Sequence, residues 1–244
     1  MRSHMAAFAM SLMMSVAATA AGPLTLEARH EHWRGFCAGK LTVDDSGVAF
    51  ESAKKEGHNW RWGWLDIQQL QLLDNGELSL LTYKDNKWRL GADREFHFRL
   101  ADQRAEAQAG ALLGRKLERR FVLGAAAAPE NVLWELPVKH LRRVSGTEGT
   151  LLAAEDRIVY KADRPGDSRT WYWQDIESIS ASGPYQLTIT SFERARAHYG
   201  DRKGFNFELK LPLAEDRYND LWRRVERAKG LEMATAAGEA KYAR

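Results

Sequence analysis

The chain has 244 residues, of which 44% are hydrophobic and 10% aromatic, so it can bury one large core or two smaller ones. Charged residues make up 28% of the chain and nearly balance, leaving a formal net charge of +3. This mixture of charges argues against an extended surface for nucleic acid or anionic lipid. We therefore expect a globular protein with no nucleic-acid partner.

Residues 1–21 have the three parts of a secretory signal peptide. Arg2 precedes an apolar run at 6–18, and small residues follow up to Ala21. The run is too short to span a bilayer comfortably, so we expect cleavage and an exported protein, periplasmic or extracellular. A cloning remnant or a buried N-terminal helix are the alternative interpretations. Cys37 is the only cysteine, which excludes an intrachain disulfide.

The second half of the chain repeats the pattern of the first. Gly39–Val43 and Gly149–Ala153 open similar runs 110 residues apart. The motif W-x-W-x-D-I at 62–67 returns at 171–176, 109 residues later. Similar pairs at almost the same offset are 77–83 with 186–192, 96–98 with 205–207, and His30 with His140. Such a constant offset predicts two homologous domains.

Each copy has a hydrophobic period of mostly two, followed by a period typical of a helix. In the first copy we expect seven short antiparallel strands, near 39–43, 47–52, 58–65, 67–73, 77–83, 86–91 and 94–100. A helix follows at 102–121 with Ala109, Leu112, Leu113 and Leu117 on one face, and a second at 213–230 with Leu213, Leu221, Trp222 and Val225. We place domain 1 at 24–122, an alanine-rich connector at 121–133, domain 2 at 133–232 and a flexible tail at 233–244.

This pattern resembles the pleckstrin-homology-like (PH-like) superfold, including its GRAM-like branch. The resembling residues are Gly39–Leu41, Gly47–Phe50 and the motif at 62–67 with its copy at 171–176. The resemblance implies a mainly β fold with C-terminal helices: two tandem domains, each a partly open barrel of about seven antiparallel strands plus one helix. These are packing positions that carry no chemistry, and the superfold hosts many functions.

Phosphoinositide binding, the best-known activity of that superfold, needs basic residues around the turn joining the first two strands. We take these turns to be 43–47 and 154–157, which are mostly acidic. Phosphate would be repelled there, so we do not expect phosphoinositide binding. Basic clusters at Arg115–Arg120, Arg194–Lys203 and Arg223–Lys229 are compatible with peripheral contact at a membrane surface, although a solvated helix face is the simpler interpretation.

His30-x-His32 would lie on one face of a strand and could ligate a metal. In the second copy, however, His32 is matched by Arg142 and Cys37 by Thr147, and the sequence shows no further ligand. We therefore expect no metal and no cofactor, and hydrogen-bonding roles for His30 and His140. No nucleophile elbow or phosphate loop is present, so an enzyme is the less favoured class. Asp66 and Asp175 suit turns in which a carboxylate caps backbone N–H groups.

The repeat separates the tryptophans into two groups. Trp62 and Trp64 recur as Trp171 and Trp173, which predicts core packing, whereas Trp60 is matched by Arg169 and is free to contact a ligand. The candidate ligand-binding residues are Trp33, Trp60, Trp88, Arg194 and Arg196. We expect a non-catalytic binding or scaffold protein of the bacterial cell envelope that recognises a protein or peptide. The alternative is an envelope enzyme or metal-binding protein with a site around His30, His32 and Cys37.

Overall fold

The computed structural model describes residues 22–32, 35–54, 56–87, 89, 91–101, 103–195 and 200–230. The strands of the first half are β1 (Leu24–His32), β2 (Gly35–Val43), β3 (Gly47–Ser52), β4 (Trp60–Gly63), β5 (Ile67–Leu73), β6 (Glu77–Asp85) and β7 (Asp93–Leu100). Helix α1 (Gln103–Leu117) and strand β8 (Phe121–Gly124) follow. The second half contains β9 (Val132–Leu141), β10 (Gly146–Ala154), β11 (Arg157–Ala162), β12 (Arg169–Tyr172), β13 (Ile176–Gly183), β14 (Gln186–Arg194), β15 (Arg202–Leu209) and α2 (Glu215–Ala228). Four 3-10 turns are η1 (Glu56–His58), η2 (Trp64–Asp66), η3 (Glu118–Arg120) and η4 (Trp173–Asp175).

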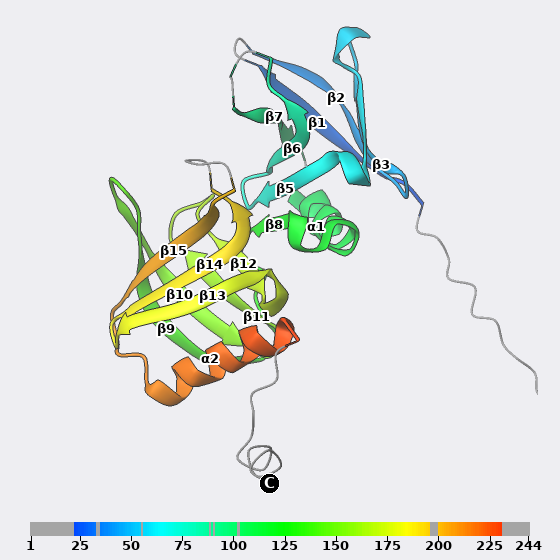
Figure 1. Cartoon of the computed structure of the whole chain (residues 1–244). Coiled ribbons are helices and arrows are strands. Elements are labelled where there is room, and N and C mark those ends of the chain that lie inside the picture. The colour runs from blue at the N-terminus through cyan, green and yellow to red at the C-terminus, as the bar shows by residue number, and fades with distance from the viewer. Residues whose placement is uncertain are drawn as a thin grey trace, which may run out of the picture.

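The protein is mainly β with a C-terminal helix, as the sequence predicts. Within the described residues all fifteen strands belong to one sheet, in the order β13-β14-β15-β9-β10-β11-β12-β8-β5-β6-β7-β1-β2-β3-β4 (Figure 1). On either side of β8 the same succession of seven strands occurs, since β5-β6-β7-β1-β2-β3-β4 and β13-β14-β15-β9-β10-β11-β12 match member by member. The repeated hydrophobic spacing therefore corresponds to a repeated strand order.

Strand β8 joins the two halves, and the sequence did not predict it. Phe121 pairs with Leu70 in a parallel ladder with β5, and Leu123 pairs with Thr170 of β12. The Thr170 hydroxyl adds a 2.7 Å hydrogen bond to the carbonyl of Ala125. The start of the expected connector is thus a strand, because partners from both halves satisfy its backbone groups.

The buried side chains form two separate cores. One combines residues of β1–β7 with Ala109, Leu113 and Leu117 of α1, and the other combines β9–β15 with Leu221 and Val225 of α2. These helix residues follow the predicted helical faces, except that Trp222 is 37% exposed. In Figure 1, α2 lies across one end of the second-half sheet, whereas α1 lies beside β5 and β8 between the two halves.

The tryptophan motif is mostly core, as predicted. Trp62, Trp171 and Trp173 are buried, and Trp64 is half-buried against the first core. The expected strand at 58–65 is wrong at its ends, since β4 stops at Gly63 and Trp64 begins the turn η2. Trp64 and Trp173 each donate an indole N–H to a backbone carbonyl, of Asp45 at 2.9 Å and Glu155 at 2.8 Å. In each copy this hydrogen bond holds the tryptophan ring at the point where the chain turns out of the strand.

The two aspartates of this motif cap the turns, as expected. Asp66 accepts the N–H of Gly63 at 2.9 Å, and Asp175 accepts the N–H of Tyr172 at 3.1 Å. Burial raises the pKa of Asp175 to about 6. Asp66 is exposed, so the two carboxylates share a geometry and differ in environment.

Two expectations about the strands are wrong. Among the described residues of 86–91 none is in a strand, because the N–H of Asn86 bonds to the carbonyl of Ala92 and closes a loop between β6 and β7. The strand β1 was absent from the expected set. Consequently the acidic turns at 43–47 and 154–157 join β2 to β3 and β10 to β11, not the first two strands of each copy. These acidic turns therefore do not bear on phosphoinositide binding at the turn between the first two strands of each copy.

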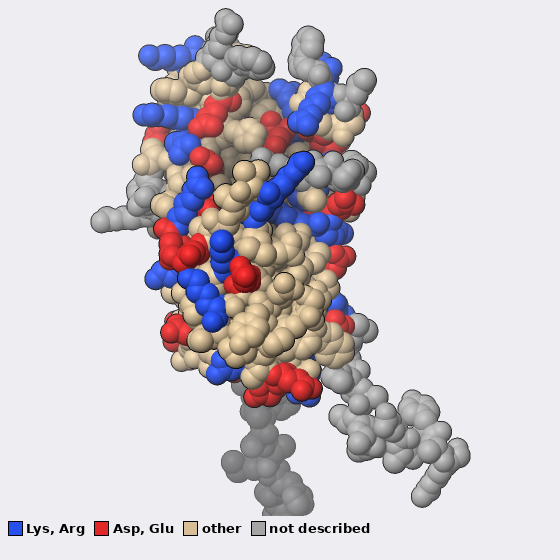
Figure 2. Space-filling view, turned by 90° about the vertical axis from the view of Figure 1, so that its left-hand side faces the viewer, with Lys and Arg blue, Asp and Glu red and all other residues tan. Residues whose placement is uncertain are grey.

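The surface carries charges of both signs. On the face shown in Figure 2, Lys and Arg alternate with Asp and Glu over the upper part and form no continuous basic area. Several basic side chains are paired within the chain, such as Lys116 with Asp45 and Arg224 with Glu155. None of the described helices has the length and apolar character needed to cross a membrane.

Candidate metal centre

A cluster of three histidines and the single cysteine lies at the end of the β1–β2 hairpin. His30 is paired directly with Cys37 across the two strands, and His32 lies two residues further on the same face of β1. His58 joins them from η1, the turn that leads into β4. One nitrogen or sulfur atom from each of the four residues lies within 4.8 Å of all the others.

These spacings are close to those of a tetrahedral zinc site. Zinc bonds of about 2.3 Å to sulfur and about 2.1 Å to nitrogen place the two ligand atoms about 3.6 Å apart. The Sγ of Cys37 is 3.6 Å from Nδ1 of His58 and 3.8 Å from Nδ1 of His30. Both separations are close to that value, and the remaining ligand atoms lie within 4.8 Å of one another.

The imidazoles of the cluster are available as ligands. Burial, together with the neighbouring rings of His32 and His58, lowers the pKa of His30 to about 4, so this ring is neutral at pH 7. Nε2 of His32 is buried and has no hydrogen-bond partner in the described part of the chain. A buried polar nitrogen without a partner is costly, and a metal ion would remove that cost.

Aromatic rings enclose the inner side of the cluster. The Trp60 ring centroid is 4.6 Å from that of His30 and 5.3 Å from that of His58, and Phe98 lies 5.3 Å from His30. Cys37 is 8% exposed, and His32 and His58 are half-buried. The cluster is thus shielded from water on the side of these rings.

The second half fills the same place with a different network. His140 pairs with Thr147 across β9 and β10, as His30 pairs with Cys37. Arg142 occupies the place of His32 and forms an ion pair with Asp167, which accepts a 2.8 Å hydrogen bond from the Thr147 hydroxyl. Burial opposes ionisation of Asp167, but the bonds from Arg142 and Thr147 hold its pKa below the usual value.

This correspondence identifies the fourth residue of the cluster. Asp167 precedes Arg169 of β12 by two residues, as His58 precedes Trp60 of β4. The four residues of the cluster therefore correspond, in order, to four residues of the second half: His30 to His140, His32 to Arg142, Cys37 to Thr147 and His58 to Asp167. In the second half, Arg142, Thr147 and Asp167 are joined by an ion pair and a hydrogen bond. In the first half, all four residues are of types that bind metal ions.

The structure corrects the expectation that the sequence holds no further ligand for the His30–His32 pair. His58 is a further residue of a ligand type, and sequence reasoning missed it although it stands two residues before Trp60. The signal was its counterpart Asp167 at the same offset of 109 as the tryptophans. The expected hydrogen-bonding role is confirmed for His30, whose Nδ1 forms a 3.8 Å hydrogen bond with Sγ of Cys37, whereas the buried Nδ1 of His140 has no partner among the described residues.

Of the predicted ligand-binding residues, Trp33, Trp88 and Arg196 lie outside the described residues. Trp60 is half-buried and forms the aromatic wall of the cluster. Arg194 lies far along the sequence at the junction of the halves, where it pairs with Asp93 and donates a 2.8 Å hydrogen bond to Gln68. Trp60 and Arg194 therefore do not contribute to one common site.

Comparisons with known proteins give no family. No protein-family model matches the chain, and no curated protein does. Among solved structures, the chain is similar to the Spt16D–Pob3N heterodimer at 10% identity and a TM-score of 0.34, over 70% of this chain and 84% of that one. It is similar to the C-terminal domain of an unknown protein from Leishmania infantum at 10% identity and a TM-score of 0.28, over 37% and 80%. It is similar to the complex of PDZ-RhoGEF DH/PH domains with activated RhoA at 13% identity and a TM-score of 0.27, over 40% of this chain and 29% of that one. Likenesses this distant carry no argument about function.

Proposed function

We propose that the chain is a metal-binding protein whose first half holds a transition-metal ion, best Zn²⁺, through His30, His32, Cys37 and His58. The observation that carries this proposal is the convergence of four ligand atoms within 4.8 Å. Three of them come from one hairpin, whose register fixes their spacing before any metal binds.

The types of ligand favour zinc among the common ions. One thiolate and three imidazoles suit borderline and soft metals, whereas Mg²⁺ and Ca²⁺ prefer oxygen ligands. Four protein ligands complete a tetrahedral zinc site and leave no open position for substrate. A structural or storage role for the ion is therefore favoured over catalysis.

The same cluster supports a catalytic cysteine less well. A thiol nucleophile needs one base, which in turn is oriented by a third group, commonly a carboxylate or amide. Within the described residues, the cluster around Cys37 contains three histidines and no carboxylate. Three imidazoles around one thiol exceed what nucleophilic catalysis requires, and they match what a metal requires.

For the fold, we propose two tandem PH-like domains, at 24–122 and 133–232, joined by β8 and the residues after it. The repeated strand order and the two separate cores support this division. Export through residues 1–21 stays a prediction, because these residues lie outside the described part.

Recognition of a protein or peptide is a second candidate function. Strands β4 and β13 form the two ends of the sheet, and an edge strand can accept an additional strand from a peptide. Hydrogen exchange would test this: a peptide ligand selected from a display library should slow exchange of amides in β4 or β13. Protection confined to other elements would contradict binding by strand addition.

Metal analysis of the purified protein tests the first proposal. We expect one Zn²⁺ per chain after saturation with ZnCl₂ and gel filtration, and loss of most of it in His32→Ala and Cys37→Ser. His97→Ala is the matched control, because His97 is largely exposed and outside the cluster. With CoCl₂ instead, we expect a thiolate-to-cobalt charge-transfer band that Cys37→Ser abolishes. Equal metal content in wild type and both cluster variants would refute the site.

A further inference from the structure

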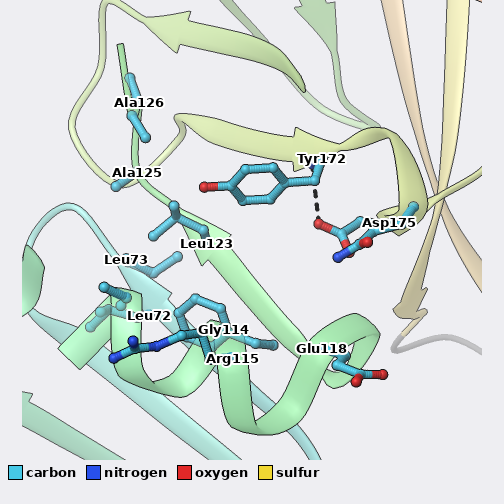
Figure 3. Close-up of a pocket in the computed structure, with 15 residues that line it drawn as sticks. Leu72, Leu73, Gly114, Arg115, Glu118, Leu123, Ala125, Ala126, Tyr172 and Asp175 are labelled. Atoms are coloured by element: carbon cyan, nitrogen blue, oxygen red, sulfur yellow. Dashed lines mark hydrogen bonds between the residues drawn. The ribbon is translucent and has the colours of Figure 1, made fainter. Parts of the chain in front are cut away.

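A second candidate site lies between the halves, away from the metal centre. A cavity of about 660 Å³ opens between α1, β8 and the segment from β12 to η4 (Figure 3). This volume is within the range of about 300–1,000 Å³ that small-molecule sites occupy. Its apolar wall consists of Leu72, Leu73, Phe121, Leu123 and Ala125–Ala127.

The cavity exists because α1 has glycine where α2 has a large side chain. Ala109 and Leu113 are buried in the first core as Leu221 and Val225 are in the second, and this alignment of the helices places Gly110 opposite Trp222. A Cβ atom on Gly110 would meet Leu123, Leu72 and Phe121, at 3.8, 3.9 and 4.0 Å. These are ordinary van der Waals distances, so a methyl group would fit there without displacing its neighbours.

The charged groups of the cavity are separated by sign. Asp175 and Glu118 lie at one end, and the Arg115 side chain extends toward the other (Figure 3). Asp175 is held by the N–H of Tyr172, and the Tyr172 ring projects over the apolar wall. Burial raises the pKa of Asp175, so its carboxylate lacks full solvation. A cationic group beside it would restore that solvation.

We propose that this cavity binds a small amphiphilic amine, with its apolar body against Leu72 and Leu123 and its ammonium group at Asp175. Charge complementarity selects the amine, because two carboxylates stand at the end where the polar group must lie. An anionic amphiphile would have to place its carboxylate near Arg115 instead. A neutral molecule would add no positive charge beside Asp175, whose carboxylate is held by the N–H of Tyr172 and the more distant charge of Arg119.

Three probes of equal chain length separate these ligands: octylamine, octanol and octanoate. We expect octylamine to displace a neutral hydrophobic dye from the protein at pH 7.5 at concentrations at least tenfold below the other two. Gly110→Leu, which fills the cavity, and Asp175→Asn, which removes the charge, should each weaken octylamine at least tenfold.

Gly183→Leu and Asp66→Asn are the matched controls and should bind as wild type does. A Cβ atom on Gly183 meets no atom within 4 Å, and Asp66 caps its turn as Asp175 does but is exposed. Far-ultraviolet circular dichroism shows that each variant is folded. Equal displacement by all three probes, or an unchanged octylamine affinity in folded Gly110→Leu, overturns the proposal. Zinc content is independent of this assay, so the two proposals fail separately.

Discussion

The strongest prediction exchanges the polar networks of the two halves. The triple variant His32→Arg, Cys37→Thr, His58→Asp gives the first half the groups found at Arg142, Thr147 and Asp167. His30 stays, as His140 does in the second half. Because the strand register is the same at both places, the variant should fold and lose its metal.

The size of the effect follows from linkage. A metal that binds only the folded state stabilises it by about 4 kcal/mol when its free concentration is 1,000 times its dissociation constant. For a chain of this size, 1 kcal/mol shifts Tm by roughly 2–4 °C, so a chelator should lower the Tm of zinc-loaded wild type by about 8–16 °C. The triple variant should show no chelator-dependent shift, because an internal ion pair replaces the ion.

Differential scanning calorimetry with and without EDTA measures this difference. The reciprocal variant Arg142→His, Thr147→Cys, Asp167→His completes a second cluster around His140, and we expect its zinc content to rise from one to two ions per chain. A folded triple variant that still binds one zinc with wild-type affinity would refute the assignment of the ligands. A folded reciprocal variant with only one zinc would show that the register alone does not create the site.

Three further predictions concern the fold. Asp175→Asn should be more stable than wild type at pH 8 by up to about 3 kcal/mol and nearly equal to it at pH 4. The reason is that the folded-state pKa of Asp175, about 6, lies above the ordinary value, so the stability of wild type is lost as pH rises through 6. Urea unfolding at both pH values measures this, and an equal difference at both contradicts it. Gly149→Ala should lower the free energy of unfolding by about 1–3 kcal/mol, since its Cβ would lie 2.3 Å from the carbonyl oxygen of Lys161. A melting temperature as high as that of wild type would contradict this clash. Trp171→Ala should lower the free energy of unfolding by about 3–5 kcal/mol, because Trp171 is 2% exposed. Tyr172→Ala, on the outer face, should lower it by under about 1 kcal/mol. Equal losses in chemical denaturation would show that the Trp171 ring is not part of the core.

The repeated residues are mostly packing positions, and this is why the repeat predicts the order of the strands. Gly39 and Gly149 recur because a Cβ at either would lie within 2.9 Å of an aromatic ring and closer still to a backbone oxygen of the neighbouring strand. The strand β8 has no such signature. Its four residues follow a helix, and only partners in β5 and β12 make them a strand. Local sequence does not contain that tertiary contribution.

Three of the four residues of the candidate metal cluster can be brought together from the sequence alone. His30, His32 and Cys37 lie within eight residues, and hairpin register brings them together. His58 is 21 residues beyond Cys37, and its approach depends on the turn η1, which no periodicity predicts. The comparison of the two copies also does not reveal this cluster, because the second half has Arg142, Thr147 and Asp167 in the places of His32, Cys37 and His58.

The two halves place different polar groups at the same hairpin. In each, the first two strands must be tied to the segment that enters the fourth, and the tie lies beside a half-buried aromatic cluster where unpaired polar groups are costly. In the second half, Asp167 supplies a charge that Arg142 and Thr147 satisfy. In the first half, His58 stands in the place of Asp167, and its three neighbours are electron-pair donors of the kind that a transition-metal ion accepts. The shared cation that we propose would link all four groups, as the ion pair and its hydrogen bond link three groups in the second half.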